Sequence, residues 1–187
     1  MTNYLGEEGD QAPLVAGLNI SNVWDYSGCS LELNHGRFMN RILYNPFLGK
    51  GHQNIIKKYR HAFWAHDGLQ AALDKRWATM SWFTAQFAAQ TAGVDPQQFL
   101  YDTTCAKAVP GVRVPLLCLN SRDDPLLSEK YLPVKRIQDN KYVAMVLTDR
   151  GGHLGWFNDD KDERGDLEQW YTPAILEYFR AMLRVSL

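Results

Sequence analysis

The 187-residue sequence lacks several features that mark whole classes of protein. It has no run of 18 apolar residues and no signal-peptide pattern, so neither a membrane-spanning helix nor a secretory leader is predicted. The formal net charge is only −1, which gives no electrostatic reason to expect a nucleic-acid partner. Internal repeats and low-complexity tracts are also absent. The length and the 45% hydrophobic content instead predict one globular domain with a substantial core.

The cysteines and histidines do not form the pattern of a metal site. The three cysteines show no Cys-x-x-Cys or other ligand spacing, and Cys118 lies inside a predicted strand, where a buried free thiol is expected. A buried free thiol favours a reducing, intracellular compartment. Four histidines match no metal motif and are expected to have structural roles: His35, His52, His61 and His66.

Two short apolar runs are each followed by polar residues. Residues 114–125 contain four consecutive apolar side chains and end in Asp-Asp-Pro, and residues 142–147 are followed by Gly-Gly-His-Leu-Gly at 151–155. Uninterrupted apolar runs bounded by turn residues are typical of strands buried on both faces of a parallel sheet. Because functional groups gather at the carboxyl ends of such strands, the acids and the histidine are the first candidates for a site.

The rest of the chain alternates between strand and helix patterns. Residues 12–22 predict a first strand, residues 25–35 are rich in turn formers, and helices are expected at 128–139 and 167–187. This alternation is typical of an α/β sheet whose parallel strands are joined by right-handed crossovers. The predicted fold class is therefore α/β, with about three parallel strands and flanking helices.

A long helical excursion separates the first two predicted strands. Apolar residues recur there at helical spacing, and Pro46 is expected to end the first helical segment. The excursion is too long for a simple crossover, so we expect a helical cap inserted at about 37–107 in a partial domain that spans residues 1–187. The acidic run at 159–163 is expected to be a solvated loop.

The polar residues after the strands suit two parts of a Ser-His-acid relay. Asp123 and Asp124 both compete for the role of the acid, and Asp124 is favoured because it directly precedes Pro125 at the strand-end turn. Asp123 is expected to cap the following turn or to face solvent. His153 lies between glycines, which let the backbone approach a ligand closely. The order of acid and then histidine matches that of α/β-hydrolases.

The nucleophile of such a relay is missing, because no Gly-x-Ser-x-Gly occurs in the chain. Ser30 follows Gly28 at the right distance, but Glu32 occupies the second small position and no strand precedes it. Ser21 and Ser121 come at strand ends, yet neither lies on a strand-to-helix elbow. The residues alone therefore supply an acid and a base without a nucleophile.

Several motifs, taken in order, resemble the carboxyl-terminal half of the YheT-like α/β-hydrolases, a group that includes acylglycerol lipases and medium-chain ethyl ester synthase/esterases. The motifs are Asn-Tyr-Leu-Gly-Glu-Glu-Gly at 3–9, Gly-Leu-Asn-Ile-Ser-Asn at 17–22, Pro-Leu-Leu at 115–117, Asp-Asp-Pro at 123–125 and Gly-Gly-His-Leu-Gly at 151–155. The resemblance covers most of the chain but is poor from about residue 73 to 107.

The resemblance implies a carboxylic ester hydrolase that needs no metal or organic cofactor. Asp124 would orient His153, and a serine in the missing first half of the fold would form the acyl-enzyme. The substrate would be a small ester or an acylglycerol, with water or an alcohol releasing the acyl group. In the full-length protein a missing amino-terminal segment could attach the enzyme to a membrane, whereas these 187 residues alone would be inactive.

The resemblance leaves an alternative from another class of function. A truncated relic of a hydrolase could have a binding or regulatory role without catalysis, and the missing serine favours that reading. Loss of the first strands would also leave the strand at 15–20 as an open edge of the sheet. We therefore expect Leu14, Val15, Leu18 and Ile20 to be partly exposed and the chain to self-associate.

Overall fold

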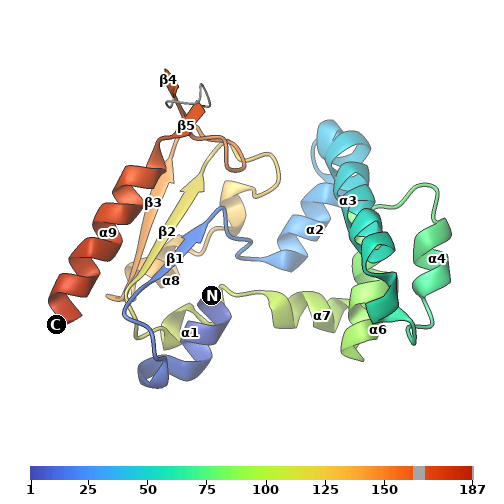
Figure 1. Cartoon of the computed structure of the whole chain (residues 1–187), viewed down its shortest axis with the longest axis horizontal. Helices are drawn as coiled ribbons and strands as arrows, with labels where there is room; N and C mark the ends of the chain where they lie inside the picture. The colour runs from blue at the N-terminus through green and yellow to red at the C-terminus, as the bar shows by residue number, and fades with distance from the viewer. Residues whose placement is uncertain (162–166, 187) are drawn as a thin grey trace. The chain divides into compact units, whose positions relative to one another are not determined.

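The structure, a computed structural model, describes residues 1–161 and 167–186. The chain divides into two compact units, which are described separately. One unit comprises Met1–Trp24 and Cys105–Leu187 and contains the sheets, and the other comprises Asp25–Thr104 and is helical (Figure 1).

Three parallel strands form the main sheet of the first unit. They are β1 (Gly17–Ile20), β2 (Leu116–Ser121) and β3 (Val143–Thr148), in the spatial order β1-β2-β3 (Figure 1). The register aligns Ser121 at the end of β2 with Thr148 at the end of β3. The α/β class with three parallel strands is thus confirmed, and the carboxyl ends of β2 and β3 lie at one edge of the sheet.

The sheet forms one layer between helices. The helical segments of this unit are α1 (Thr2–Glu8), η1 (Gly9–Gln11), η5 (Val109–Gly111), η6 (Glu129–Tyr131), α8 (Val134–Gln138) and α9 (Tyr171–Ser186). A separate antiparallel pair consists of β4 (Phe157–Lys161) and β5 (Leu167–Gln169).

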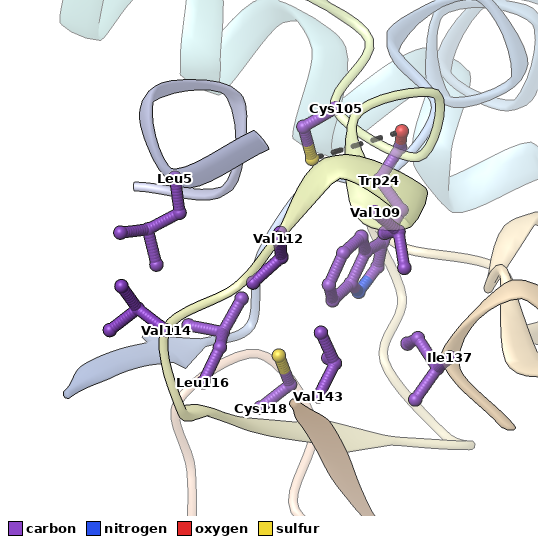
Figure 2. Packing of buried hydrophobic residues seen from close by; sticks show 10 residues of the cluster. All are labelled: Leu5, Trp24, Cys105, Val109, Val112, Val114, Leu116, Cys118, Ile137 and Val143. Carbon is purple, nitrogen blue, oxygen red and sulfur yellow. Dashed lines mark hydrogen bonds between the residues drawn. The ribbon is translucent and has the colours of Figure 1, made fainter. Parts of the chain in front are cut away.

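Alternate side chains of β2 point into two different apolar clusters, as the period of a strand requires. Leu116 and Cys118 lie in the larger cluster, which Figure 2 shows around Trp24 and which also includes Leu5, Cys105, Val109, Val112, Val114, Ile137 and Val143. Leu119 lies in the smaller cluster, with Trp156 and Tyr171. Since both faces of β2 are covered, its uninterrupted apolar sequence is explained.

The edge strand β1 is shorter than the predicted 12–22. Its only pairing in the described part of the chain is with β2. Leu14 and Val15 precede the strand and are 40% and 44% exposed, whereas Leu18 and Ile20 are half-buried. The expected self-association of the chain stays a prediction.

The second unit is a bundle of short helices with its own core. Its segments are α2 (Tyr26–His35), η2 (Asn40–Tyr44), α3 (Asn45–Lys58), η3 (Arg60–Phe63), α4 (Leu69–Asp74), α5 (Met80–Phe83), η4 (Thr84–Ala88), α6 (Ala89–Ala92) and α7 (Pro96–Thr103). The core contains Ile56, Ala72, Ala78, Phe83 and Phe87. The buried amide of Gln53 on α3 lies within hydrogen-bond distance of three carbonyls at the end of α4, so the two helices are tied together.

Two predictions for this unit are wrong. Residues 25–35 form helix α2 instead of turns, because the Asp25 carboxylate accepts the Gly28 N–H and caps the helix. Pro46 does not end a helix either. It lies in the first turn of α3, directly after the π-helical turn η2, so its missing N–H is tolerated there.

Three predictions for the first unit also need correction. The helix expected at 128–139 is divided into η6 and α8, with Pro133 between them. The helix expected at 167–187 begins at Tyr171, and residues 167–169 form β5. The acidic run 159–163 is not one loop, since residues 159–161 belong to β4 and residues 162 and 163 lie outside the described residues.

The buried thiol on β2 predicts a pH dependence of stability. Burial raises the pKa of Cys118 from 9.0 to about 12. Below pH 9 the thiol is protonated in both states, and as the pH rises toward 12 only the unfolded chain loses the proton. We therefore expect the free energy of unfolding to fall between pH 9 and 12, and to fall less steeply in Cys118→Ala. Urea unfolding of both proteins across this range measures the difference, and parallel curves would contradict the prediction.

Candidate active site

Two loops meet at the carboxyl edge of the sheet. The first follows β2 and carries Asp123 and Asp124, and the second follows β3 and carries His153. The ladder continues beyond the strands, because the Arg122 N–H donates to the Thr148 carbonyl at 2.9 Å. Parallel pairing therefore brings together residues that are about 30 positions apart in the sequence.

Asp124 and His153 are in direct contact. The Asp124 Oδ2 lies 2.9 Å from the His153 Nδ1. The other carboxylate oxygen, Oδ1, accepts the N–H groups of Leu126 at 2.8 Å and Leu127 at 3.1 Å. The Asp124 side chain has no exposed surface, whereas 31% of the His153 side chain is exposed. A buried, fully paired carboxylate thus holds one nitrogen of an imidazole that remains open to solvent.

This arrangement selects one form of the histidine. A carboxylate beside Nδ1 favours the tautomer with its proton on that nitrogen, which leaves Nε2 as an acceptor. It also stabilises the imidazolium that forms when Nε2 takes up a proton. The pair can therefore act as a general base and then as a general acid.

Asp123 faces solvent, which is one of its two expected roles, and has a further contact. The other expected role, capping the following turn, belongs to Asp124. The Asp123 Oδ1 accepts the Gly152 N–H at 2.8 Å. Because Gly152 directly precedes His153, both acids of the Asp-Asp-Pro motif contact the histidine loop. The sequence spacing alone does not reveal this second contact.

Glycines give the histidine loop its shape. Gly152 has a φ of +53°, Leu154 has a φ of +70°, and the Gly155 N–H closes the loop on the Gly151 carbonyl at 2.7 Å. Gly151 has a φ of +151°, and a Cβ on it would lie 2.0 Å from the Nε1 of Trp156. The indole of Trp156 is itself fixed, because it donates to the Thr148 hydroxyl at 2.8 Å.

A pair of glycine variants tests this close packing. Gly151→Ala is expected to lower the free energy of unfolding by about 2–4 kcal/mol, because the methyl group collides with the fixed indole of Trp156 and because a φ of +151° is strained for alanine. The matched variant Gly152→Ala has nothing within 4 Å of its added methyl group and should lose only about 1–2 kcal/mol, the cost of its left-handed backbone. Equal losses in chemical denaturation would refute the proposed collision.

The serines considered as nucleophiles do not contact the histidine. Among the serines whose side chains the structure describes, none has its hydroxyl hydrogen-bonded to His153. Ser121 instead donates to the Gly152 carbonyl at 2.7 Å, and Ser30 lies on α2 in the other unit. Ser21 follows β1 with a φ of +47°, and its buried hydroxyl has no partner in the described part of the chain. Cys118 is held inert by its raised pKa.

The described residues contain no group of three or more His, Cys, Asp or Glu side chains that could hold a metal ion. None of their helices is both long and apolar enough to cross a bilayer.

The chain is similar to curated hydrolases, although no protein-family model matches it. It is 26% identical over 184 residues to a protein named monoacylglycerol lipase from Saccharomyces cerevisiae, which covers 96% of the chain and 39% of that relative. It is 31% identical over 157 residues to phospholipase ABHD3 from Mus musculus, covering 83% of the chain and 37% of the relative. It is 28% identical over 200 residues to medium-chain fatty acid ethyl ester synthase/esterase 2 from Saccharomyces cerevisiae, and the match covers 96% of the chain and 42% of that relative. The chain thus spans about two fifths of the length of these relatives.

Proposed function

Because the chain belongs to the acylglycerol lipase and esterase group of the α/β-hydrolases, we propose that it supplies the acid and the base of a serine carboxylic ester hydrolase. His153 is the base and Asp124 is the acid that orients it. The observation that supports this assignment most strongly is the 2.9 Å contact between the buried carboxylate of Asp124 and the Nδ1 of His153.

In the proposed mechanism the proton moves through the Nε2 of His153. A serine hydroxyl gives its proton to Nε2 while its oxygen attacks the ester carbonyl, and Asp124 stabilises the resulting imidazolium. The imidazolium then returns the proton to the leaving alcohol, which leaves an acyl-enzyme. Water attacks next, with His153 again acting as the base, and releases the carboxylic acid. An alcohol in place of water would give a new ester.

The nucleophile is not among the described contacts of His153, and the 187 residues contain no Gly-x-Ser-x-Gly. We propose that these residues correspond to the carboxyl-terminal part of the relatives. The serine and the donors that stabilise the oxyanion would then lie in the portion of the fold outside the match. Residues 1–187 alone should not hydrolyse esters, since loss of a single oxyanion donor already costs about 10²–10³ in rate.

The relatives' names support a proposal for the substrate class, because they are those of a monoacylglycerol lipase, a phospholipase and a fatty acid ethyl ester synthase/esterase. We propose an acylglycerol or another ester of a fatty acid as the substrate. The helical unit, Asp25–Thr104, is inserted in the sequence between β1 and β2. We propose that this inserted unit contributes to the choice of acyl chain.

A non-catalytic role is the second candidate, favoured by the absence of a nucleophile elbow from the sequence. A fluorophosphonate probe distinguishes the two. Residues 1–187 should remain unlabelled, and a chimera that joins them to the unmatched portion of the Saccharomyces cerevisiae monoacylglycerol lipase should be labelled at its serine. Labelling of a serine within residues 1–187 would contradict the proposed division of the site. A folded chimera that is not labelled would favour the non-catalytic role.

A further inference from the structure

The residue before His153 is held by both of its backbone polar groups. The Gly152 N–H donates to the Asp123 carboxylate at 2.8 Å, and the Gly152 carbonyl accepts the Ser121 hydroxyl at 2.7 Å. Both partners come from the end of β2 and the loop that follows it. The two peptide units that flank Gly152 are thus attached to the segment that also carries Asp124.

We propose that Ser121 and Asp123 are positioning residues that hold the Gly152 backbone so that the His153 imidazole meets Asp124. This inference rests on the catalytic pair proposed above. Three side chains within four positions of one segment contact two consecutive residues of the other: Ser121 and Asp123 hold Gly152, and Asp124 holds His153.

The backbone conformation of the histidine loop explains why hydrogen bonds to Gly152 are needed to position His153. Gly152 and Leu154 both have left-handed φ values, and glycine at 152 has little intrinsic preference for one conformation. His153 lies between them, with nearly a third of its side chain exposed, so packing alone does not fix the imidazole. Hydrogen bonds to the preceding peptide units limit the rotation that would carry Nδ1 away from Asp124.

The hydrogen bonds that Ser121 and Asp123 make to Gly152 differ in solvent exposure and in charge. Ser121 is 1% exposed, so its bond to the Gly152 carbonyl is shielded from water and satisfies a buried hydroxyl. Asp123 is exposed, but its bond to the Gly152 N–H is assisted by the charge of the carboxylate. Their effects on the loop can therefore be separated by single substitutions.

The test uses NMR spectroscopy of the 187-residue chain, with the low-field Nδ1 proton of His153 as the reporter. This resonance is assigned by its loss in His153→Ala. In Ser121→Ala and in Asp123→Ala we expect it to shift upfield and to exchange with solvent about tenfold faster or more. In Asp123→Ala the Gly152 amide should also exchange at least about tenfold faster. Near-UV circular dichroism verifies that each variant keeps its tertiary structure.

Two control variants separate positioning from a general loss of structure. Asp123→Asn keeps an oxygen that can accept the Gly152 N–H and should preserve the resonance. Arg122 lies between the two positions, and the ion pairs that its side chain makes with described residues, Glu129 and Asp149, are at the surface, so Arg122→Ala should also preserve the resonance. The inference is overturned if Ser121→Ala and Asp123→Ala give the same reporter shift and exchange rate as Arg122→Ala.

The low-field proton tests the catalytic pair in the unsubstituted chain and the positioning role in the Ser121 and Asp123 variants. Absence of the low-field proton in the unsubstituted chain would refute the contact between Asp124 and His153, and with it both proposals. If the proton is present and is lost from the Ser121 and Asp123 variants, the holding role stands. That result is independent of whether the chimera hydrolyses an ester.

Discussion

Asp124→Asn is expected to lower the kcat of ester hydrolysis by about 10⁴-fold in the chimera while leaving its fold intact. The asparagine Oδ1 can still accept the Leu126 and Leu127 N–H groups. Its amide, however, would donate to the Nδ1 of His153, where the carboxylate accepted. The proton of the imidazole would then sit on Nε2, which could no longer take the proton of the serine.

Asp124→Ala is the matched comparison, because it removes both functions of the carboxylate. The Leu126 and Leu127 amides would be left without an acceptor, at a cost of about 1–3 kcal/mol each if they stay buried. Steady-state kinetics and urea unfolding of the two variants therefore separate catalysis from stability. Full activity in Asp124→Asn would contradict the assigned tautomer, and equal stability of the two variants would contradict the capping role.

Trp24→Ala is expected to have the largest effect on stability, a loss of about 3–5 kcal/mol in the free energy of unfolding. Trp24 is 1% exposed and is a member of the larger apolar cluster of the sheet unit, which Figure 2 shows. Its indole N–H also donates to the Asn120 Oδ1 at 3.1 Å. Replacement would therefore leave a cavity and a buried oxygen without its donor.

Trp64→Ala provides the control for the same chemical change at the surface. Trp64 is 81% exposed, so its loss should change the free energy of unfolding by no more than about 0.5 kcal/mol. Guanidinium unfolding followed by circular dichroism compares the two proteins. A loss below about 1 kcal/mol in Trp24→Ala would show that the cluster is not a tightly packed core.

The sheet could be predicted from the sequence because its signals are local. The apolar runs that contain β2 and β3 are short and are bounded by turn residues, so each run marks one strand. Burial on both faces holds for β2 alone, since Ala144 and Val146 of β3 are exposed. Parallel pairing then requires that the loops after these strands meet at one edge. The contact of Asp124 with His153 follows from those two facts, and the 2.9 Å distance agrees with it.

The elements that were missed depend on contacts that sequence patterns do not encode. Helix α2 has little amphipathic pattern, and its start depends on one capping contact from Asp25. The short strand β5 forms by pairing with β4, and its residues fall within the helix predicted at 167–187. Asp123 could not be assigned, because the position of the Gly152 N–H depends on left-handed backbone in the next loop. The sequence did contain a signal for α2, because Asp25 is a favourable N-cap residue, but it contained no signal for the contact of Asp123 with Gly152.

The activity of the chimera with His153→Ala tests the proposed function most directly. The matched variant is His61→Ala, which changes an exposed histidine in the helical unit. Initial rates of monoacylglycerol hydrolysis, measured at saturating substrate, compare both variants with the unsubstituted chimera. We predict a fall in kcat of about 10⁶-fold for His153→Ala and an unchanged kcat for His61→Ala. Hydrolysis by His153→Ala at the rate of the unsubstituted chimera would contradict the assignment of His153 as the base.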